Sequence, residues 1–350
     1  MKKLKVGVVG AGGIANDHIN NFQSDPRTEV VAVMDANLET AKTKAKRFNV
    51  PVATSKVEDL MSNRDIDIIS VATPNCFHAP YSIAALKAGK HVLCDKPFAM
   101  NQKEAIQVIA AAKKAKKIFM VGMNQRFTRQ SQATLLQLRS GAIGDPYFAK
   151  AYWLRRAGIP GFGGWFTTKK MAGGGALLDI GVHLLDLCLH LINNFEPLCV
   201  TGASYNKLGC RGIGKGTYGE TRGNAKFDVD DFTTSLIKLK GGMTVELKAS
   251  WAFHQPIREA FDVEINGTEG AIMNYAQKLC RFGKADSYEV IDYGVPSDLP
   301  FPAANRYHHF IDVVFGDAKQ LCTPEQSLAV QKIIDGIYES SATGKEVRIK

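Results

Sequence analysis

A stripe of polar side chains interrupts the apolar segment Ala176–Ile192. It consists of Asp179, His183, Asp186 and His190, at intervals of four, three and four residues. These intervals place the side chains along one face of a helix. Residues at i and i+4 can meet there, so Asp179 can fix the tautomer of His183 and favour its role as a proton acceptor. The same pair could instead form a buried structural hydrogen bond.

Zinc binding is an alternative interpretation of the stripe. Asp179 and His190 lie eleven residues apart, which is about 16 Å along a helix and too far for one ion. Further ligands would be needed, and none can be identified, so we predict no metal site. The preceding glycines, residues 173–175, would let the backbone approach a ligand closely.

A second candidate reactive group is Lys96, in the sequence Cys94-Asp95-Lys96-Pro97. The short apolar run before it is typical of a buried parallel strand, and open α/β sheets bind ligands at the carboxyl ends of such strands. A lysine there can donate a hydrogen bond to an alcohol or carbonyl oxygen. Pro97 would restrict Lys96 to extended geometry. As an isolated residue, Lys96 would be interpreted as a surface lysine.

Residues 10–15 read Gly-Ala-Gly-Gly-Ile-Ala, between a predicted strand and a predicted helix. In this pattern Gly10 allows a tight turn, and Gly12 lets the backbone approach the pyrophosphate of a dinucleotide at the helix N-terminus. Asp35 ends the next predicted strand, where an acid binds the adenosine ribose. Its charge would repel a 2′-phosphate and no arginine follows it, so NAD is favoured over NADP. Asp35 could also cap the following helix.

The elements that position these residues alternate between strands and helices in the first third of the chain. We predict strands at Lys3–Gly10, Glu29–Asp35, Ile66–Thr73, His91–Cys94 and Ile118–Gly122, with helices between them. This alternation is typical of a doubly wound parallel sheet. After Asn124, a long apolar helix and short strands predict an antiparallel or mixed sheet with helices on one face. The sequence therefore predicts an α/β protein, with a Rossmann domain over 1–124 and an α+β domain with an open-faced sheet over 125–350.

Composition excludes several other classes of protein. The net charge of +10 could attract an anionic partner, but the lysines are scattered and do not alternate with aromatic residues as in nucleic-acid readers. No apolar run approaches the ~20 residues of a membrane span. The seven cysteines are odd in number and form no C-x-x-C pair, which favours reduced thiols and a cytoplasmic location.

A second glycine-rich segment, Asn206–Arg222, contains a G-x-x-x-x-G-K match that ends at Lys215. The next residue is Gly216, where a nucleotide-binding loop needs serine or threonine for its metal. We interpret this segment as a lid or an oligomer contact.

Together these motifs resemble the glucose-fructose oxidoreductase, inositol dehydrogenase and rhizopine-catabolism family. The resemblance runs along nearly the whole chain and includes Gly10–Ala15, Ala72–Asn75 with His78, Asp95–Pro97, Gly173–His183 and Thr343–Val347. It implies that Lys96, Asp179 and His183 are the catalytic set. Cofactor contacts are expected from Gly10, Ala11, Gly12, Gly13, Ile14, Asp35, Ala72, Thr73, Pro74, Asn75, His78, Asp95, Lys96 and Asn124. Aspartate at position 95 departs from the commoner glutamate.

The resemblance implies an NAD-dependent oxidoreductase, forming a homodimer or homotetramer, that acts on a secondary alcohol of a sugar, sugar derivative or cyclitol. His183 would take the hydroxyl proton, Asp179 would orient His183, and Lys96 would hydrogen-bond the reacting oxygen. We expect substrate contacts from Trp153, Arg156, Trp165 and Tyr307. Two alternatives are an NAD-dependent glycosidase on the same fold and a non-catalytic regulator that senses dinucleotides.

Overall fold

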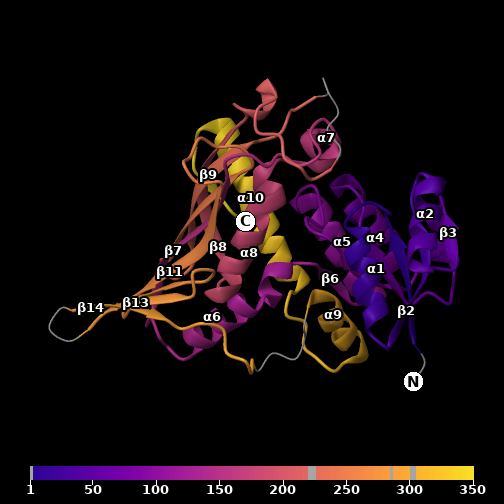
Figure 1. The fold of residues 1–350 in the computed structure, drawn as a ribbon, viewed down its shortest axis with the longest axis horizontal. Helices are drawn as coiled ribbons and strands as arrows, with labels where there is room; N and C mark the ends of the chain where they lie inside the picture. Colours follow the sequence, from indigo (N-terminus) through magenta and orange to yellow (C-terminus); the bar gives the residue numbers. More distant parts are fainter. Residues whose placement is uncertain (1–2, 220–225, 284–286, 300–304) are drawn as a thin grey trace. The chain divides into compact units, whose positions relative to one another are not determined.

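The computed structural model describes residues 3–219, 226–283, 287–299 and 305–350 (Figure 1). The chain divides into two compact units, and each is described by itself. The first comprises Met1–Met123 and Pro302–Leu328, and the second comprises Asn124–Phe301 and Ala329–Lys350. The sequence predicts that all of 125–350 forms one domain. Residues 305–328 pack instead with the first unit, because their helix contacts a helix and a strand of that unit.

Six parallel strands form the sheet of the first unit in the order β3-β2-β1-β4-β5-β6. They are β1 (Leu4–Val9), β2 (Thr28–Met34), β3 (Val52–Thr54), β4 (Ile68–Val71), β5 (His91–Cys94) and β6 (Phe119–Val121). The helices are α1 (Ala15–Ser24), α2 (Leu38–Phe48), α3 (Val57–Ser62), η1 (Asn75–Phe77), α4 (His78–Lys87), α5 (Gln102–Ala115) and α9 (Arg306–Phe315). This order is that of a dinucleotide-binding sheet, so the predicted Rossmann fold is confirmed.

Burial explains which strands the sequence revealed. All four residues of β4 are buried, as are the last four of β1, so these strands read as continuous apolar runs. The edge strand β3 has three residues and an exposed first residue, and the sequence analysis missed it.

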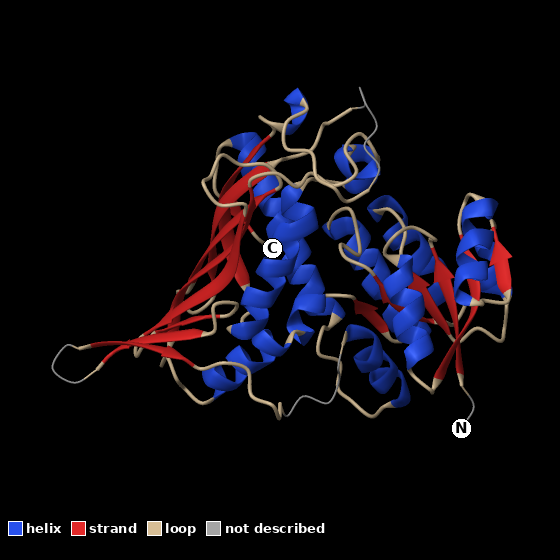
Figure 2. Ribbon diagram, viewed as in Figure 1, coloured by secondary structure: helices blue, strands red, loops and turns tan. Residues whose placement is uncertain are grey.

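The second unit contains a nine-stranded mixed sheet in the order β14-β13-β12-β11-β7-β10-β9-β8-β15. Strands are drawn red and helices blue in Figure 2. The strands are β7 (Pro146–Arg155), β8 (Pro197–Tyr205), β9 (Phe232–Leu239), β10 (Thr244–Ser250), β11 (Glu259–Gly267), β12 (Ala271–Met273), β13 (Lys278–Phe282), β14 (Tyr288–Asp292) and β15 (Val347–Arg348). Only β7 and β10 pair in parallel, which confirms the predicted mixed sheet. The sequence predicts β9, β10, β11 and β12 of this sheet, but not β7, β8, β13, β14 or β15.

The helical segments after residue 123 complete the second unit. They are η2 (Asn124–Phe127), α6 (Arg129–Arg139), η3 (Trp165–Thr167), α7 (Lys169–Ala172), the π-helical turn η4 (Leu177–Gly181), α8 (Val182–Leu191), η5 (Gly209–Arg211) and α10 (Pro324–Thr343). Of these, α10 begins in the first unit and continues in the second. The helices η4 and α8 pack on β7 and β10.

Small side chains on the buried face of the sheet explain how closely η4 and α8 pack on it. Ala149 and Ala151 of β7 are fully buried, and their small side chains let a helix approach the sheet. At Gly181, a Cβ would lie 2.9 Å from the Cβ of Ala249, so glycine is needed for this close contact. The helical stretch Lys169–Leu191 has the length and apolar composition of a membrane span, but 83% of its most apolar window is buried, as in the core helix of a globular unit.

A buried ion pair joins η2 to α8. Arg126 donates two hydrogen bonds to Asp186, of 2.7 Å from Nε and 2.6 Å from Nη2. The exposed fractions of the two side chains are 0% and 1%. Two charges at this depth are stable only when both remain paired. The Asp186 carboxylate of the polar stripe therefore holds η2 and α8 together.

We predict that Arg126→Met lowers the free energy of unfolding by about 3–5 kcal/mol, because it leaves the Asp186 carboxylate buried without its partner. Urea denaturation followed by circular dichroism measures this change. Adding Asp186→Leu should recover part of the loss. As a control, Lys113→Met removes the exposed pair of Lys113 with Glu325 and should cost under about 1 kcal/mol. Equal losses in the two single variants would contradict the structural role.

Candidate active site

The glycine-rich loop between β1 and α1 has the shape that a dinucleotide pyrophosphate requires. Gly10 has φ +100°, and a Cβ there would collide with the carbonyl oxygen of Ala72, so no other residue fits. At Gly12, by contrast, a Cβ would meet no atom within 4 Å. The backbone at Gly12 is thus open to a ligand, next to the N-terminus of α1.

Asp35 and Lys44 hold this loop in place. The Asp35 carboxylate accepts hydrogen bonds of 2.9 Å from the backbone N–H of Ala11 and of Asn37. From α2, the Lys44 ammonium donates to the carbonyl oxygen of Gly12 (3.0 Å) and to Asn16 (2.5 Å). Burial lowers the pKa of Lys44. Sequence reasoning missed Lys44, since it lies 32 residues from Gly12.

His78 connects two segments that follow neighbouring strands. One ring nitrogen lies 2.7 Å from the carbonyl oxygen of Thr73, and the other lies 2.5 Å from that of Pro97. Two carbonyl acceptors favour a protonated ring, but burial is the larger effect and lowers the pKa of His78. The side chain is buried and supports the two segments. The Thr73 hydroxyl is also buried, and no partner for it lies within the described residues.

Asp95 lies in a buried charged cluster that only the structure reveals. Its carboxylate accepts a 3.1 Å hydrogen bond from Arg306 of α9 and a 3.0 Å hydrogen bond from the backbone N–H of Lys96. Burial opposes ionisation of Asp95, but Arg306, with smaller contributions from His18, Lys96 and His78, holds its pKa well below the usual range. Burial also lowers the pKa of His18 to about 3. The cluster fixes the backbone at Lys96, whose peptide bond to Pro97 is cis.

Tyr307, which was predicted to contact substrate, is buried in the first unit. Its ring packs edge-on against His18 and Phe22, with centroids 5.1 and 5.6 Å apart, and its hydroxyl accepts a 2.8 Å hydrogen bond from Arg306. These contacts favour a role in supporting Arg306 over the predicted stacking on a sugar. The predicted site residues of the first unit thus gather after β1, β2, β4 and β5, at the carboxyl ends of parallel strands.

In the second unit, Asp230 anchors the segment that carries Asp179. Its carboxylate accepts hydrogen bonds from the backbone N–H of Gly175 (2.7 Å) and Leu177 (2.9 Å) and from the Tyr338 hydroxyl (2.7 Å). A Cβ at Gly175 would collide with the carbonyl oxygen of Asp230. The sequence predicts that the glycine triplet leaves room for a ligand. The structure shows that Gly175 gives room to Asp230, and Gly174 to Tyr338.

Asp179 and His183 both contact a tryptophan. The indole N–H of Trp251 donates a 2.9 Å hydrogen bond to the Asp179 carboxylate, and Trp251 is fully buried. The His183 ring centroid lies 6.3 Å from that of Trp153, and His183 is half-buried. A carboxylate held by an indole N–H keeps its position, and a half-buried imidazole is a side chain that can accept or donate a proton near neutral pH.

Next to His183, β7 and β11 present an aromatic and basic surface. Phe261 stacks on Trp153 with centroids 5.3 Å apart, and the Arg155 guanidinium lies 4.9 Å from the centroid of Trp153. Glu259 accepts hydrogen bonds from the indole of Trp153 (2.6 Å) and from Arg155 (2.7 Å). Despite the cost of burial, these bonds lower the pKa of Glu259. An aromatic ring held in this way can stack on the apolar face of a sugar.

The remaining predicted residues have other surroundings. Asn124 is exposed at the start of η2. Arg156 is exposed and donates a 3.2 Å hydrogen bond to the carbonyl oxygen of Pro256. Trp165 stacks on Phe166, with centroids 3.7 Å apart. The four residues of the polar stripe have different surroundings. Asp186 is bound to Arg126, and burial and nearby arginines lower the pKa of His190 to about 3.

Asp231 organises the start of the glycine-rich segment 206–222. Its carboxylate accepts hydrogen bonds from the backbone N–H groups of Lys207, Leu208 and Gly209, with lengths of 2.9, 2.6 and 2.7 Å. Residues 220–222 of this segment lie outside the described residues. Over the described part of the chain, no group of three or more His, Cys, Asp or Glu side chains is arranged to hold a metal ion.

Comparison with known proteins identifies the family of both parts of the chain. Residues 4–123 match the oxidoreductase family with an NAD-binding Rossmann fold, and residues 135–273 match the GFO/IDH/MocA C-terminal domain. The fold and site define a dinucleotide-binding oxidoreductase. The chain belongs to the Gfo/Idh/MocA oxidoreductase family, as the sequence predicted.

Individual relatives include sugar dehydrogenases. D-glucoside 3-dehydrogenase of Escherichia coli K12 is 28% identical, over 99% of this chain and 97% of its own length. Levoglucosan dehydrogenase of Pseudarthrobacter phenanthrenivorans is 29% identical, over 79% and 75%. The solved structure of a levoglucosan dehydrogenase with NADH and levoglucosan has a TM-score of 0.81 and 26% identity, over 99% of this chain and all of the other.

The contact of Tyr338 with Asp230 generates a prediction. Tyr338→Phe removes one of the donors that hold Asp230, so the free energy of unfolding should fall by about 1–2 kcal/mol. Chemical denaturation measures the change. Tyr147→Phe is the matched control, since Tyr147 is 58% exposed, and it should have no effect. If Tyr338→Phe is as stable as that control, Asp230 does not depend on this hydrogen bond.

Proposed function

We propose that this protein is an NAD-dependent dehydrogenase that oxidises a secondary hydroxyl group of a sugar or sugar derivative. The observation that carries the proposal is the arrangement of η4 and α8. Asp179 is held by Trp251, and His183 lies one turn further along, beside the Trp153 ring. The dehydrogenases of D-glucosides and levoglucosan among its relatives support a sugar substrate.

In this reaction His183 takes the proton from the substrate hydroxyl. Asp179 orients the imidazole and stabilises its charged form, as carboxylates do for histidine bases. Lys96 donates a hydrogen bond to the reacting oxygen as it becomes a carbonyl oxygen. The buried cluster of Asp95 with Arg306 keeps Lys96 in position through the backbone. When bound, the nicotinamide supplies the acceptor for the hydride.

The residues of the first unit fit the dinucleotide. Gly12 leaves its backbone open to the pyrophosphate, next to the free N–H groups that begin α1. The buried Thr73 hydroxyl is a further polar group available to a ligand. Asp35 stands at the end of β2, where its charge opposes a 2′-phosphate. These features support NAD over NADP.

The surface beside His183 supports a pyranose-like substrate. Trp153 and Phe261 offer apolar faces, and Arg155 and Glu259 add charged groups at the rim. Sugars present both kinds of surface, since C–H groups gather on one face of the ring and hydroxyls lie at its edge. We therefore place Trp153 with Trp165 and Arg156 among the candidate substrate contacts.

The test is NADH formation at 340 nm with the purified protein, NAD and a panel of glucosides, anhydrosugars, free aldoses and inositols. NADP is assayed in parallel. We expect turnover with NAD and at least one sugar, and a lower kcat/KM with NADP. Glycoside cleavage without net NADH would instead identify the redox-neutral glycosidase. NAD binding without turnover of any substrate would favour the regulator.

Two substitutions test the assigned roles. His183→Asn and Lys96→Met should each lower kcat by roughly 10²-fold or more, because each removes a proton-transfer or hydrogen-bonding group. Affinity for NADH, measured by fluorescence titration, should stay within a few-fold. His254→Asn and Lys114→Met, at exposed positions, are the matched controls and should retain activity. Near-normal turnover in either test variant would rule out its role.

A further inference from the structure

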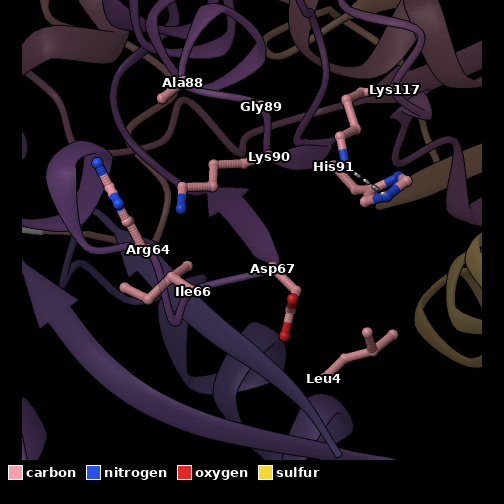
Figure 3. Close-up of a pocket in the computed structure, with 9 residues that line it drawn as sticks. All are labelled: Leu4, Arg64, Ile66, Asp67, Ala88, Gly89, Lys90, His91 and Lys117. Carbon is pink, nitrogen blue, oxygen red and sulfur yellow. Dashed lines mark hydrogen bonds between the residues drawn. The ribbon is translucent and has the colours of Figure 1, made fainter.

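A cavity of about 330 Å³ opens at the amino ends of the parallel strands in the first unit (Figure 3). Its lining comes from the starts of β1 and β5 and from the segments directly before β4, β5 and β6. The lining residues are Leu4, Arg64, Ile66, Asp67, Ala88, Gly89, Lys90, His91 and Lys117. Because all the strands are parallel, this edge is opposite to the one that carries Asp35, Thr73 and Asp95. The cavity is therefore separate from the candidate dinucleotide site.

Basic groups dominate the cavity. Arg64, Lys90 and Lys117 line it, and within the described ranges none of them forms an ion pair with an acidic side chain. The one lining acid is Asp67, whose carboxylate already accepts a 2.9 Å hydrogen bond from the backbone N–H of Lys5. The lining thus carries an excess of positive charge.

Lys90 is unusual because it is only 5% exposed. Its ammonium donates one hydrogen bond, of 2.5 Å, to the carbonyl oxygen of Asn63, whereas an ammonium has three donors. Burial lowers the pKa of Lys90, and Lys117 reinforces that effect, while the more distant charges of Asp67 and Asp65 oppose it without forming an ion pair with Lys90. A buried cation without an anionic partner is costly, and an anion in the cavity would supply that partner.

The His91 ring also has more hydrogen-bond donors around it than it can accept from. The backbone N–H of Ile118 donates to one ring nitrogen of His91 (3.2 Å), and the Lys117 ammonium faces the other at 3.4 Å, as the dashed line in Figure 3 marks. A neutral imidazole has only one acceptor nitrogen. Burial and Lys117 lower the pKa of His91 to about 4, so the ring is neutral. One ring nitrogen of His91 therefore carries a hydrogen. At that nitrogen the ring N–H faces a second donor, either the backbone N–H of Ile118 or the Lys117 ammonium.

We propose that this cavity binds a phosphate group, either as inorganic phosphate or as the phosphate of a small sugar ester. An oxyanion accepts hydrogen bonds from several donors at once. Its oxygens can accept hydrogen bonds from the single ring N–H of His91, the Lys117 ammonium and the unused donors of Lys90, while Arg64 supplies a planar pair of donors at the rim. Asp67 can accept a hydrogen bond from a hydroxyl group of the ester. The volume is within the range of small-molecule sites.

The experiment uses the protein saturated with NAD, so that the dinucleotide pyrophosphate site is filled. Inorganic phosphate and glucose 6-phosphate are titrated at constant ionic strength, and the ring signals of His91 are followed by NMR. His91→Gln identifies those signals. We expect a saturable shift of the His91 signals with at least one of the two probes. A tighter effect of the ester would identify the sugar phosphate as the ligand, and equal effects would identify phosphate itself.

Lys117→Met and Arg64→Met should each weaken this binding by about tenfold, as expected for the loss of one charged hydrogen-bond donor. Lys114→Met is the matched control. It removes an exposed lysine of the neighbouring helix α5 and should leave the affinity unchanged. No saturable shift with either probe, or equal affinity in Lys117→Met and the control, would overturn the proposal.

Discussion

The buried carboxylate of Asp230 controls the geometry of the second unit where it carries the candidate reactive side chains Asp179 and His183. It binds the backbone of Gly175 and Leu177 directly before and within the π-helical turn that contains Asp179. An aspartate can satisfy backbone donors that a helix start leaves free. Tyr338 and Thr233 also donate to the same carboxylate, at 2.7 and 3.2 Å. Elements far apart in the sequence are thus fixed to one acid.

The first unit uses a comparable arrangement. Asp95 accepts from the Lys96 backbone and from Arg306, which also donates to the carbonyl oxygen of Gly122. Buried ion pairs add little net stability, but breaking one leaves an uncompensated charge and is costly. The pair therefore serves to hold the chain after β5 in one position. The backbone that carries the candidate reactive residues of each unit is thus held by a buried carboxylate.

Charge is unevenly distributed over the Rossmann sheet. At the carboxyl ends of its strands, Asp35 and Asp95 are occupied by backbone and guanidinium donors. At the amino ends, Arg64, Lys90 and Lys117 line one cavity. The net charge of +10 is thus partly concentrated at a single place. Scattered lysines in a sequence can converge in this way, because the starts of parallel strands share one edge of the sheet.

The sequence by itself determined the fold class, the glycine-rich loop and the candidate reactive residues. Local signals were sufficient there, since buried parallel strands are apolar runs, glycine alone tolerates the backbone of position 10, and helical spacing relates Asp179 to His183. Strands β7 and β8 escaped detection because their half-exposed residues show weak alternation. Only the tertiary structure shows that Asp186 pairs with Arg126 and that Tyr307 accepts a hydrogen bond from Arg306. It also shows that the glycine triplet gives room to Asp230 and Tyr338. Apart from the neighbouring pair of Arg306 and Tyr307, these contacts join residues that lie 55 or more positions apart, such as Gly175 with Asp230 and Arg126 with Asp186, and no local pattern exists for them.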